Sequence, residues 1–187
     1  HIGTDVLRQV VKNLRQRILD AEGEIWFHAQ VTDFHLEAGA LRSVTVQKGG
    51  ETCRIPVEAL VLAVGHSARD TFARLAERGV PMRAKDFAVG LRVEHPQEMI
   101  QLAQYGTSDR RFLPAADYKL TAQTGEGRGV YSFCMCPGGQ VVNASSEPGH
   151  LAVNGMSRAA RDGRNANSAL IVTVRREDYP GEGPLAG

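Results

Sequence analysis

The stretch that decides the fold is Glu24–Ala59, EIWFHAQVTDFHLEAGALRSVTVQKGGETCRIPVEA. Apolar and polar residues alternate along three segments of it, a period that is typical of half-buried strands. These segments cover residues 24–37, 41–48 and 52–59. Gly39 and the Gly49-Gly50 pair separate them, and glycines at such positions are typical of turns. The pattern predicts a meander of three antiparallel strands.

The flanking segments predict a helix before the meander and a buried strand after it. Upstream, apolar residues from Leu7 to Ile18 recur at helical spacing and predict an amphipathic helix that begins at Thr4-Asp5. Downstream, ALVLAVGHSA, residues 59–68, is a continuous apolar run that ends at Gly65. Such runs are typical of buried strands in parallel sheets. We therefore expect an α/β (α+β) fold.

The rest of the chain is predicted to be rich in strands. Two further helices are expected at residues 68–79 and 98–106, and residues 106–129 have the composition of a loop. The predicted strands cover residues 80–97, 128–136, 140–147, 150–157 and 168–178. We place the boundary between the first part and this β-rich part at residues 82 and 83.

Composition excludes some classes of protein. The chain has 187 residues and a formal net charge of +1, so no bulk positive charge indicates nucleic acid or an anionic membrane. Its apolar runs are too short to span a bilayer, and no signal peptide is visible, so we expect a cytoplasmic protein. Three cysteines are typical of a reducing compartment. The first residue, His1, and the loop-like ending GEGPLAG suggest a piece of a longer protein.

Several segments together resemble a family of uncharacterised bacterial FAD-dependent dehydrogenases, flavoproteins with a glutathione-reductase-type FAD-binding domain. They are HIGTD, VLAVGHSARDTF, AVGLRVEHPQ, AADYKLT, GVYSFCMCPGGQVVNASSE, NGMSRAARDG and NANSALIVTV. The resemblance implies an internal fragment. Residues 1–82 would be the second half of a Rossmann-like FAD/NAD(P)-binding domain, and residues 83–187 an incomplete β-rich substrate domain. The family's G-x-G-x-x-G fingerprint, which places the FAD pyrophosphate at a helix N-terminus, does not occur in this sequence.

The resemblance also implies which residues contact FAD in the first part. Val31 would lie beside the adenine, and Ala63 and Gly65 near the flavin. Gly65, His66 and Ser67 follow the expected buried strand, and open α/β sheets bind ligands at that end of their strands. His66 is the candidate catalytic residue, because a histidine near a flavin can stabilise the reduced anion or shuttle a proton. The alternative is a simple strand-to-helix turn with Ser67 as the N-cap.

The stretch CMCPGG, residues 134–139, is a second candidate site. Pro137, Gly138 and Gly139 allow a close approach of the main chain to flavin or substrate. A metal site would need more ligands than Cys134 and Cys136 provide, so no metal is expected. A redox dithiol would need an accessible thiol with a lowered pKa, and the C-x-C spacing has poor geometry for it. We expect both cysteines to share one face of a strand and to serve packing.

Two polar groups of residues have open interpretations. Arg92 and Glu94 share a strand face, which fits either an ion pair, a substrate contact or solvated charges, and His95 lies at the strand end before Pro96. A later cluster fits turns or a substrate-recognition loop. Its members are Asn154, Arg161, Asp162, Asn165 and Asn167.

Two functions fit these observations. The first is part of an FAD-dependent oxidoreductase that transfers a hydride or electron pair between FAD and an unknown small molecule, with NAD(P)H as a candidate donor. The second is a non-catalytic binding module of the same fold that recognises a partner or RNA. The balanced charge argues against a nucleic-acid partner. The sequence does not define the substrate or the oligomeric state.

Overall fold

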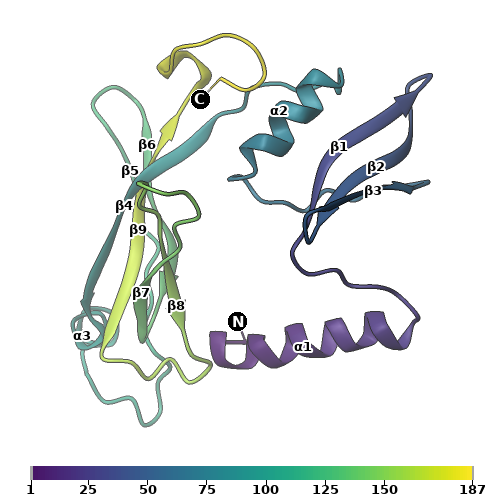
Figure 1. Ribbon diagram of the computed structural model, residues 1–187. Coiled ribbons are helices and arrows are strands. Elements are labelled where there is room, and N and C mark those ends of the chain that lie inside the picture. The colour runs from purple at the N-terminus through teal and green to yellow at the C-terminus, as the bar shows by residue number, and fades with distance from the viewer. Residues whose placement is uncertain (1, 187) are drawn as a thin grey trace. The chain divides into compact units, whose positions relative to one another are not determined.

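The computed structural model describes residues 2–186 and shows an α+β fold in which every sheet is antiparallel (Figure 1). The chain forms two compact units. Unit 1 comprises the chain up to Glu22 together with Asp86–Arg175, and unit 2 comprises Gly23–Lys85 together with the chain from Arg176 onward. None of the helices within residues 2–186 is long and apolar enough to cross a membrane.

Unit 2 contains the predicted meander. Its strands are β1 (Ala29–Glu37), β2 (Ala40–Lys48) and β3 (Glu51–Pro56), paired antiparallel in that order. Helix α2 (Arg69–Glu77) packs on β1, with Asp70 in its first turn and Arg74 in its last, as the helix dipole favours. A short 3₁₀ helix, η1 (Arg176–Asp178), follows the last strand of the chain. The predicted meander and the helix predicted at residues 68–79, which is α2, are therefore confirmed.

The core of unit 2 is small and lies between the meander and α2. Phe34 from β1, Val44 and Val46 from β2 and Leu75 from α2 are buried together. Phe34 and Val44 are also cross-strand partners, so the register of the hairpin places two core side chains side by side. Alternation along β1 and β2 is what brings these residues to one face of the sheet.

The expected buried strand at residues 59–68 is not present. The chain is irregular from Val57 to Ala68. Leu60 packs partly buried against the core of unit 2, but Val61, Leu62 and Val64 are exposed, with Val61 89% exposed. A strand buried on both faces needs hydrogen-bonded neighbours on both sides. The sheet of unit 2 consists of the three meander strands, and none of the described strands pairs with this run. Because the sheets are all antiparallel, the Rossmann-like part is not among the elements that the structure describes.

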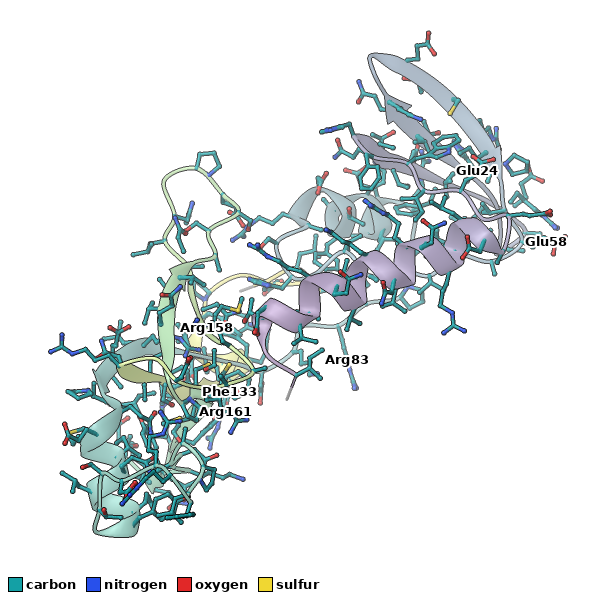
Figure 2. The ribbon with its side chains drawn as sticks, turned by 90° about the horizontal axis from the view of Figure 1, so that it is seen from below. Glu24, Glu58, Arg83, Phe133, Arg158 and Arg161 are labelled. Atoms are coloured by element: carbon teal, nitrogen blue, oxygen red, sulfur yellow. The ribbon has the colours of Figure 1, made fainter. Side chains whose placement is uncertain are left out.

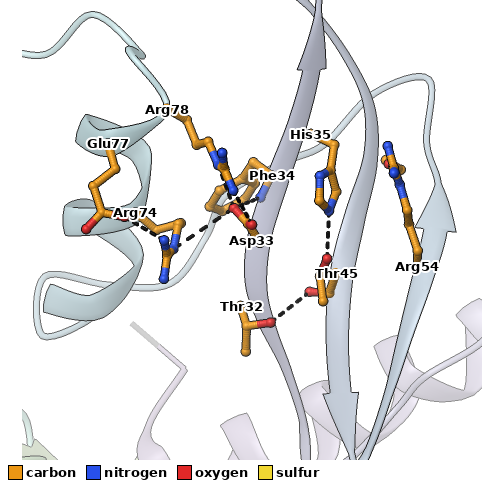
Figure 3. A network of polar contacts seen from close by, with 10 residues as sticks. Thr32, Asp33, Phe34, His35, Thr45, Arg54, Arg74, Glu77 and Arg78 are labelled. Atoms are coloured by element: carbon orange, nitrogen blue, oxygen red, sulfur yellow. Dashed lines mark hydrogen bonds and ion pairs between the residues drawn. The ribbon is translucent and has the colours of Figure 1, made fainter.

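An ion-pair network joins α2 to the meander (Figure 3). The Arg78 guanidinium binds both carboxylate oxygens of Asp33 on β1, with Nε donating to Oδ1 at 2.7 Å. The main-chain N–H of Phe34 also donates to Oδ1, at 2.8 Å. The Arg78 hydrogen bonds, followed by the Phe34 N–H, lower the pKa of Asp33 from 3.8 to about 2. Hydrogen bonds to the charged form favour it, which explains the direction.

This network predicts an acid-sensitive step in the stability of unit 2. The pKa of Asp33 is lower in the folded state, so its stabilisation is fully present above pH 3.8 and is lost as the pH falls through about 2. We expect the loss to be about 1 kcal/mol, because the pair is partly open to solvent. Asp33→Asn should remove this part of the pH dependence. Urea unfolding at a series of pH values, followed by Trp26 fluorescence, measures it.

The matched control is Glu58→Gln, which removes an exposed carboxylate of the same unit and leaves the Asp33 network in place. It should keep the wild-type change in the free energy of unfolding between pH 3.8 and about 2. If Asp33→Asn kept that change as well, the assignment to Asp33 would be wrong.

Unit 1 consists of two antiparallel sheets and two helices. The larger sheet has the order β4-β9-β6-β5, and the smaller is the hairpin of β7 and β8. The strands are β4 (Phe87–Pro96), β5 (Thr121–Gln123), β6 (Gly129–Cys136), β7 (Gly139–Asn143), β8 (Val153–Ser157) and β9 (Asn165–Val174). The helices are α1 (Thr4–Asp20) and α3 (Gln97–Tyr105). Most of the strands expected in this part of the chain are present, but β5 lies within residues 106–129, which were expected to form a loop.

The first turn of α1 is attached to the end of β8. The Thr4 hydroxyl donates to the carbonyl of Ser157 at 3.1 Å, and the N–H of Ala159 donates to the Asp5 carboxylate at 2.9 Å. A Cβ at Gly3 would overlap the main chain of Ala159, so glycine is required for this close approach. The apolar stripe of α1, by contrast, is largely exposed, and none of its residues is fully buried.

Candidate functional site

A cleft of about 820 Å³ lies within unit 1, where the first turn of α1 meets the hairpin of β7 and β8. The size is in the range of pockets that bind small molecules. It is lined by Thr4, Asp5, Arg8, Glu94, Gly138, Gly139, Gln140, Val142, Met156, Ser157, Arg158, Gly163, Arg164 and Asn165. Two of the residues predicted to approach a ligand, Gly138 and Gly139, are therefore in its wall.

Protein packing explains why the turn at residues 137–139 contains glycines. Gly138 has φ of +55°, and a Cβ there would overlap the carbonyl of Arg161. Its N–H donates to Gln97 Oε1 at 2.8 Å, and its carbonyl accepts from the N–H of Gly163 at 3.1 Å. The carbonyl of Pro137 accepts from the Ser157 hydroxyl at 2.8 Å. The turn is thus held rigidly, and where it lines the cleft it presents main chain without side chains.

Positive charge in the cleft is available for a ligand. Arg8 and Arg164 are exposed, and within residues 2–186 neither guanidinium has a hydrogen-bond or ion-pair partner. The third arginine, Arg158, follows the end of β8 (Figure 2). It pairs with Asp162 at 2.9 Å. Guanidinium groups are the preferred partners of phosphates and carboxylates, because their N–H groups match two acceptor oxygens at once.

The two carboxylates of the cleft are already bound by the protein. Glu94 accepts from Asn165 Nδ2 at 2.6 Å and from the N–H of Val141 at 3.2 Å. The Asp5 carboxylate accepts from the N–H of Ala159, and this hydrogen bond lowers the pKa of Asp5. Both carboxylates thus have hydrogen-bond donors within the protein, whereas the guanidinium groups of Arg8 and Arg164 have no such partner within residues 2–186, so the cleft favours an anionic ligand.

Buried polar side chains support the strands behind the turn. Asn167 on β9 is 0% exposed, and its Oδ1 accepts from Arg92 Nη1 at 2.7 Å. The same Arg92 nitrogen donates to the carbonyl of Cys134 at 3.1 Å. Gln97 and Gln101 are also buried and hydrogen-bonded to the main chain at Ala116. These hydrogen bonds hold the main chain behind the turn in place, although Asn167 Nδ2 and Gln101 Nε2 are buried without a hydrogen-bond partner within residues 2–186.

The predicted site residues fall in different units. Pro137, Gly138 and Gly139 belong to unit 1, and the others belong to unit 2. Val31 lies on β1 and packs partly buried against the core of that unit. The remaining four, Ala63, Gly65, His66 and Ser67, lie on the irregular segment before α2.

That segment has an open backbone. Gly65 has φ of +73°, and the space where a Cβ would be is empty. His66 is exposed, and its Nε2 lies 3.5 Å from the Ser67 hydroxyl. The N-cap of α2 is Ala68 and not Ser67, so the capping role considered for Ser67 is wrong.

The polar groups singled out in the sequence do not form a single site. Arg92 binds Asn167 and Cys134, whereas Glu94 binds Asn165 and Val141, so the two do not pair with each other. His95 contacts the Tyr118 hydroxyl at 2.8 Å. Of the later cluster, Asn165 reaches the cleft, Asn167 is buried, and Arg161 and Asp162 occupy the loop that packs on Gly138.

Sequence reasoning missed Arg8, Arg158 and Arg164. Arg8 lies on a helix whose other arginines look the same in the sequence, and Arg164 lies in a stretch that has the composition of a turn. No local signal distinguishes them. They come together because the first turn of α1 contacts the end of β8, a contact between segments that are distant in the chain.

The residues of the cleft suit the anionic groups of the ligands that the family resemblance implies. Two unpaired arginines beside a main-chain turn suit a phosphate or carboxylate group, which FAD, NAD(P)H and many substrates have. Among residues 2–186, by contrast, no group of three or more His, Cys, Asp and Glu side chains is placed to bind a metal ion.

Comparison with known proteins adds two findings. A family model described as FAD-dependent protein, C-terminal domain-like, matches residues 86–187. An uncharacterised protein of Clostridium beijerinckii is 52% identical over 189 residues, an alignment that covers 100% of this chain and 35% of that relative. The chain thus spans about a third of the length of the relative that it matches.

Proposed function

Since the chain belongs to the family of FAD-dependent proteins whose C-terminal domain matches residues 86–187, we propose that it is part of an FAD-dependent oxidoreductase. Unit 1 binds an anionic small-molecule substrate in its cleft. FAD, when bound, supplies the redox chemistry by exchanging a hydride or electron pair with that molecule. The Rossmann-like part with the G-x-G-x-x-G fingerprint belongs, in this proposal, to the portion of the full-length protein that the chain does not span.

The observation that supports this assignment is the pair of unpartnered arginines at the Pro137–Gly139 turn. Arg164 lies beside that turn, because the preceding residue, Gly163, donates its N–H to the carbonyl of Gly138. Arg8 approaches from α1, whose first turn is fixed to β8 by Thr4. The two guanidiniums orient the anionic group of the substrate, and the bare main chain at Gly138 and Gly139 leaves room for the rest of the molecule.

Unit 2 contributes the proposed contacts to FAD. Gly65 leaves bare main chain in a left-handed conformation, which supports a close approach to a planar group. His66, exposed beside it, is the proposed proton shuttle, and Ala63, Ser67 and Val31 are the further proposed contacts.

The first test is the visible spectrum of the full-length protein and of the Clostridium beijerinckii relative. We expect purified protein to be yellow, with flavin absorption that bleaches when a reductant such as NADPH or a carboxylic-acid substrate is added anaerobically. Colourless protein that FAD neither colours nor stabilises against heat would contradict the oxidoreductase. That result would favour the alternative, a binding module without flavin.

Variants of the arginines separate substrate binding from FAD binding. Arg8→Gln and Arg164→Gln should each raise the reductant concentration for half-maximal flavin bleaching about tenfold, the effect of losing one charged hydrogen bond. Flavin content should stay at one per chain in both. Arg17→Gln, on the exposed end of the same helix, is the matched control and should change neither quantity. A loss of flavin in Arg8→Gln or Arg164→Gln would show that these arginines bind the cofactor and not the substrate.

A further inference from the structure

A bulge in β6 brings the sulfurs of Cys134 and Cys136 together. Phe133 pairs with Ala169 on β9 and Cys136 pairs with Asn167, so β6 has one residue more than its partner between these pairs. Cys134 takes up the extra residue with φ of +49°. In a regular strand, residues two apart have Cα atoms separated by about 6.6 Å. Their side chains are parallel, so the two Sγ atoms of such a pair would lie about as far apart as the Cα atoms. Here the two Sγ atoms are 4.0 Å apart.

This geometry changes the expectation that both cysteines pack on one face of a regular strand. Cys136 is 5% exposed and does pack in the interior, but Cys134 is exposed to solvent. The left-handed backbone is uncommon for a cysteine and costs free energy. Arg92 holds the bulge by donating to the carbonyl of Cys134 at 3.1 Å, and the Cys136 thiol approaches the same carbonyl at 3.4 Å.

We propose that Cys134 and Cys136 form a reversible intramolecular disulfide by exchange with a low-molecular-weight disulfide. The pair has one accessible sulfur and one buried sulfur within reach of it, and a disulfide requires the two to approach by about 2 Å. The disulfide would directly precede Pro137 and so restrain the strand end that leads into the turn. The inference does not depend on the presence of FAD.

The exchange proceeds in two balanced steps. The thiolate of exposed Cys134 attacks one sulfur of the small disulfide RSSR, which forms a mixed disulfide and releases RS⁻. The Cys136 thiolate then attacks the Cys134 sulfur, closes the ring and releases the second RS⁻, and the two thiol protons end on the two RSH molecules. The protein loses two electrons and RSSR gains them. Burial, followed by the neighbouring Cys134, raises the pKa of Cys136, which fits its role as the second, resolving thiol.

The test uses the full-length protein equilibrated with glutathione and glutathione disulfide at a series of ratios. Free thiols are blocked with N-ethylmaleimide, and the protein is digested with trypsin. Both cysteines lie on one tryptic peptide, residues 129–158, whereas Cys53 lies on another, residues 49–54. We expect peptide 129–158 to lose two hydrogens and to carry neither blocking group nor glutathione. Ring closure should be at least about tenfold more favourable in the folded protein than in the isolated peptide.

The variants and the third cysteine provide the controls. Cys136→Ser should retain a single glutathione on Cys134. Cys134→Ser should form no disulfide within peptide 129–158. Cys53 is exposed and shows that the oxidant has reacted. The proposal is wrong if peptide 129–158 stays doubly blocked at ratios where Cys53 carries glutathione. It is equally wrong if glutathione accumulates on Cys134 in the wild type, or if the isolated peptide closes its ring as readily as the folded protein.

Discussion

Replacing Gly138 with alanine should destabilise unit 1 by about 3 kcal/mol or more. The residue has φ of +55°, where any side chain is strained, and a Cβ would overlap the carbonyl of Arg161. The turn has no room to relax, because Gln97 binds the N–H of Gly138 and Gly163 binds its carbonyl. The added methyl group must therefore break hydrogen bonds or displace the loop at Arg161 that packs on the cleft.

A matched variant separates the steric overlap from the backbone strain. Gly127 has φ of +75°, but its Cβ position is in open space. Gly127→Ala therefore introduces only the backbone strain and should lower the free energy of unfolding by about 1 kcal/mol. Hydrogen exchange of peptides from β6 to β9 reports on unit 1, while Trp26, the one tryptophan of the chain, reports on unit 2. Equal effects of the two variants would show that Gly138 is not closely packed.

Phe34→Ala should destabilise unit 2 by about 3–5 kcal/mol. Phe34 is 2% exposed and contacts a core of few other fully buried residues, Val44, Val46 and Leu75. A small core has few side chains that could move into the space left by a phenyl ring, so the cavity remains and its cost is high. Urea unfolding followed by Trp26 fluorescence measures the change.

Val61→Ala is the control, because it removes apolar atoms from unit 2 without the loss of a core side chain. Val61 is 89% exposed, so this change should alter the free energy of unfolding by less than about 0.5 kcal/mol. A small effect of Phe34→Ala on the Trp26 transition would mean that the meander does not depend on this cluster.

Much of the fold could be predicted because it depends on local patterns. Alternation over residues 24–59 predicted the meander, and apolar spacing predicted α1, although the stripe of α1 is exposed in the structure. Turn glycines such as Gly39 and Gly49 have positive φ, as their places between strands required. Each of these features is set by residues a few positions apart.

The candidate site was only partly predictable. Gly138 and Gly139 were singled out and do line the cleft, but their need for glycine comes from the Arg161 and Met156 main chain across the turn. The arginines of the cleft were missed, because Arg8 and Arg164 meet only through the docking of α1 on β8. The approach of the Cys134 sulfur to the Cys136 sulfur depends on a bulge in β6, which exists only in the pairing of β6 with β9.

The amino-acid sequence by itself determined the meander, most of the other strands, the helices and the tight turns of this protein, since those depend on side-chain period and backbone conformation over a few residues. Tertiary structure alone decided that the apolar run at residues 59–65 is not a strand, that two cysteines approach each other and that two arginines share a cleft. Such features depend on pairing between distant segments. An apolar run becomes a buried strand only when neighbouring strands satisfy its backbone hydrogen bonds.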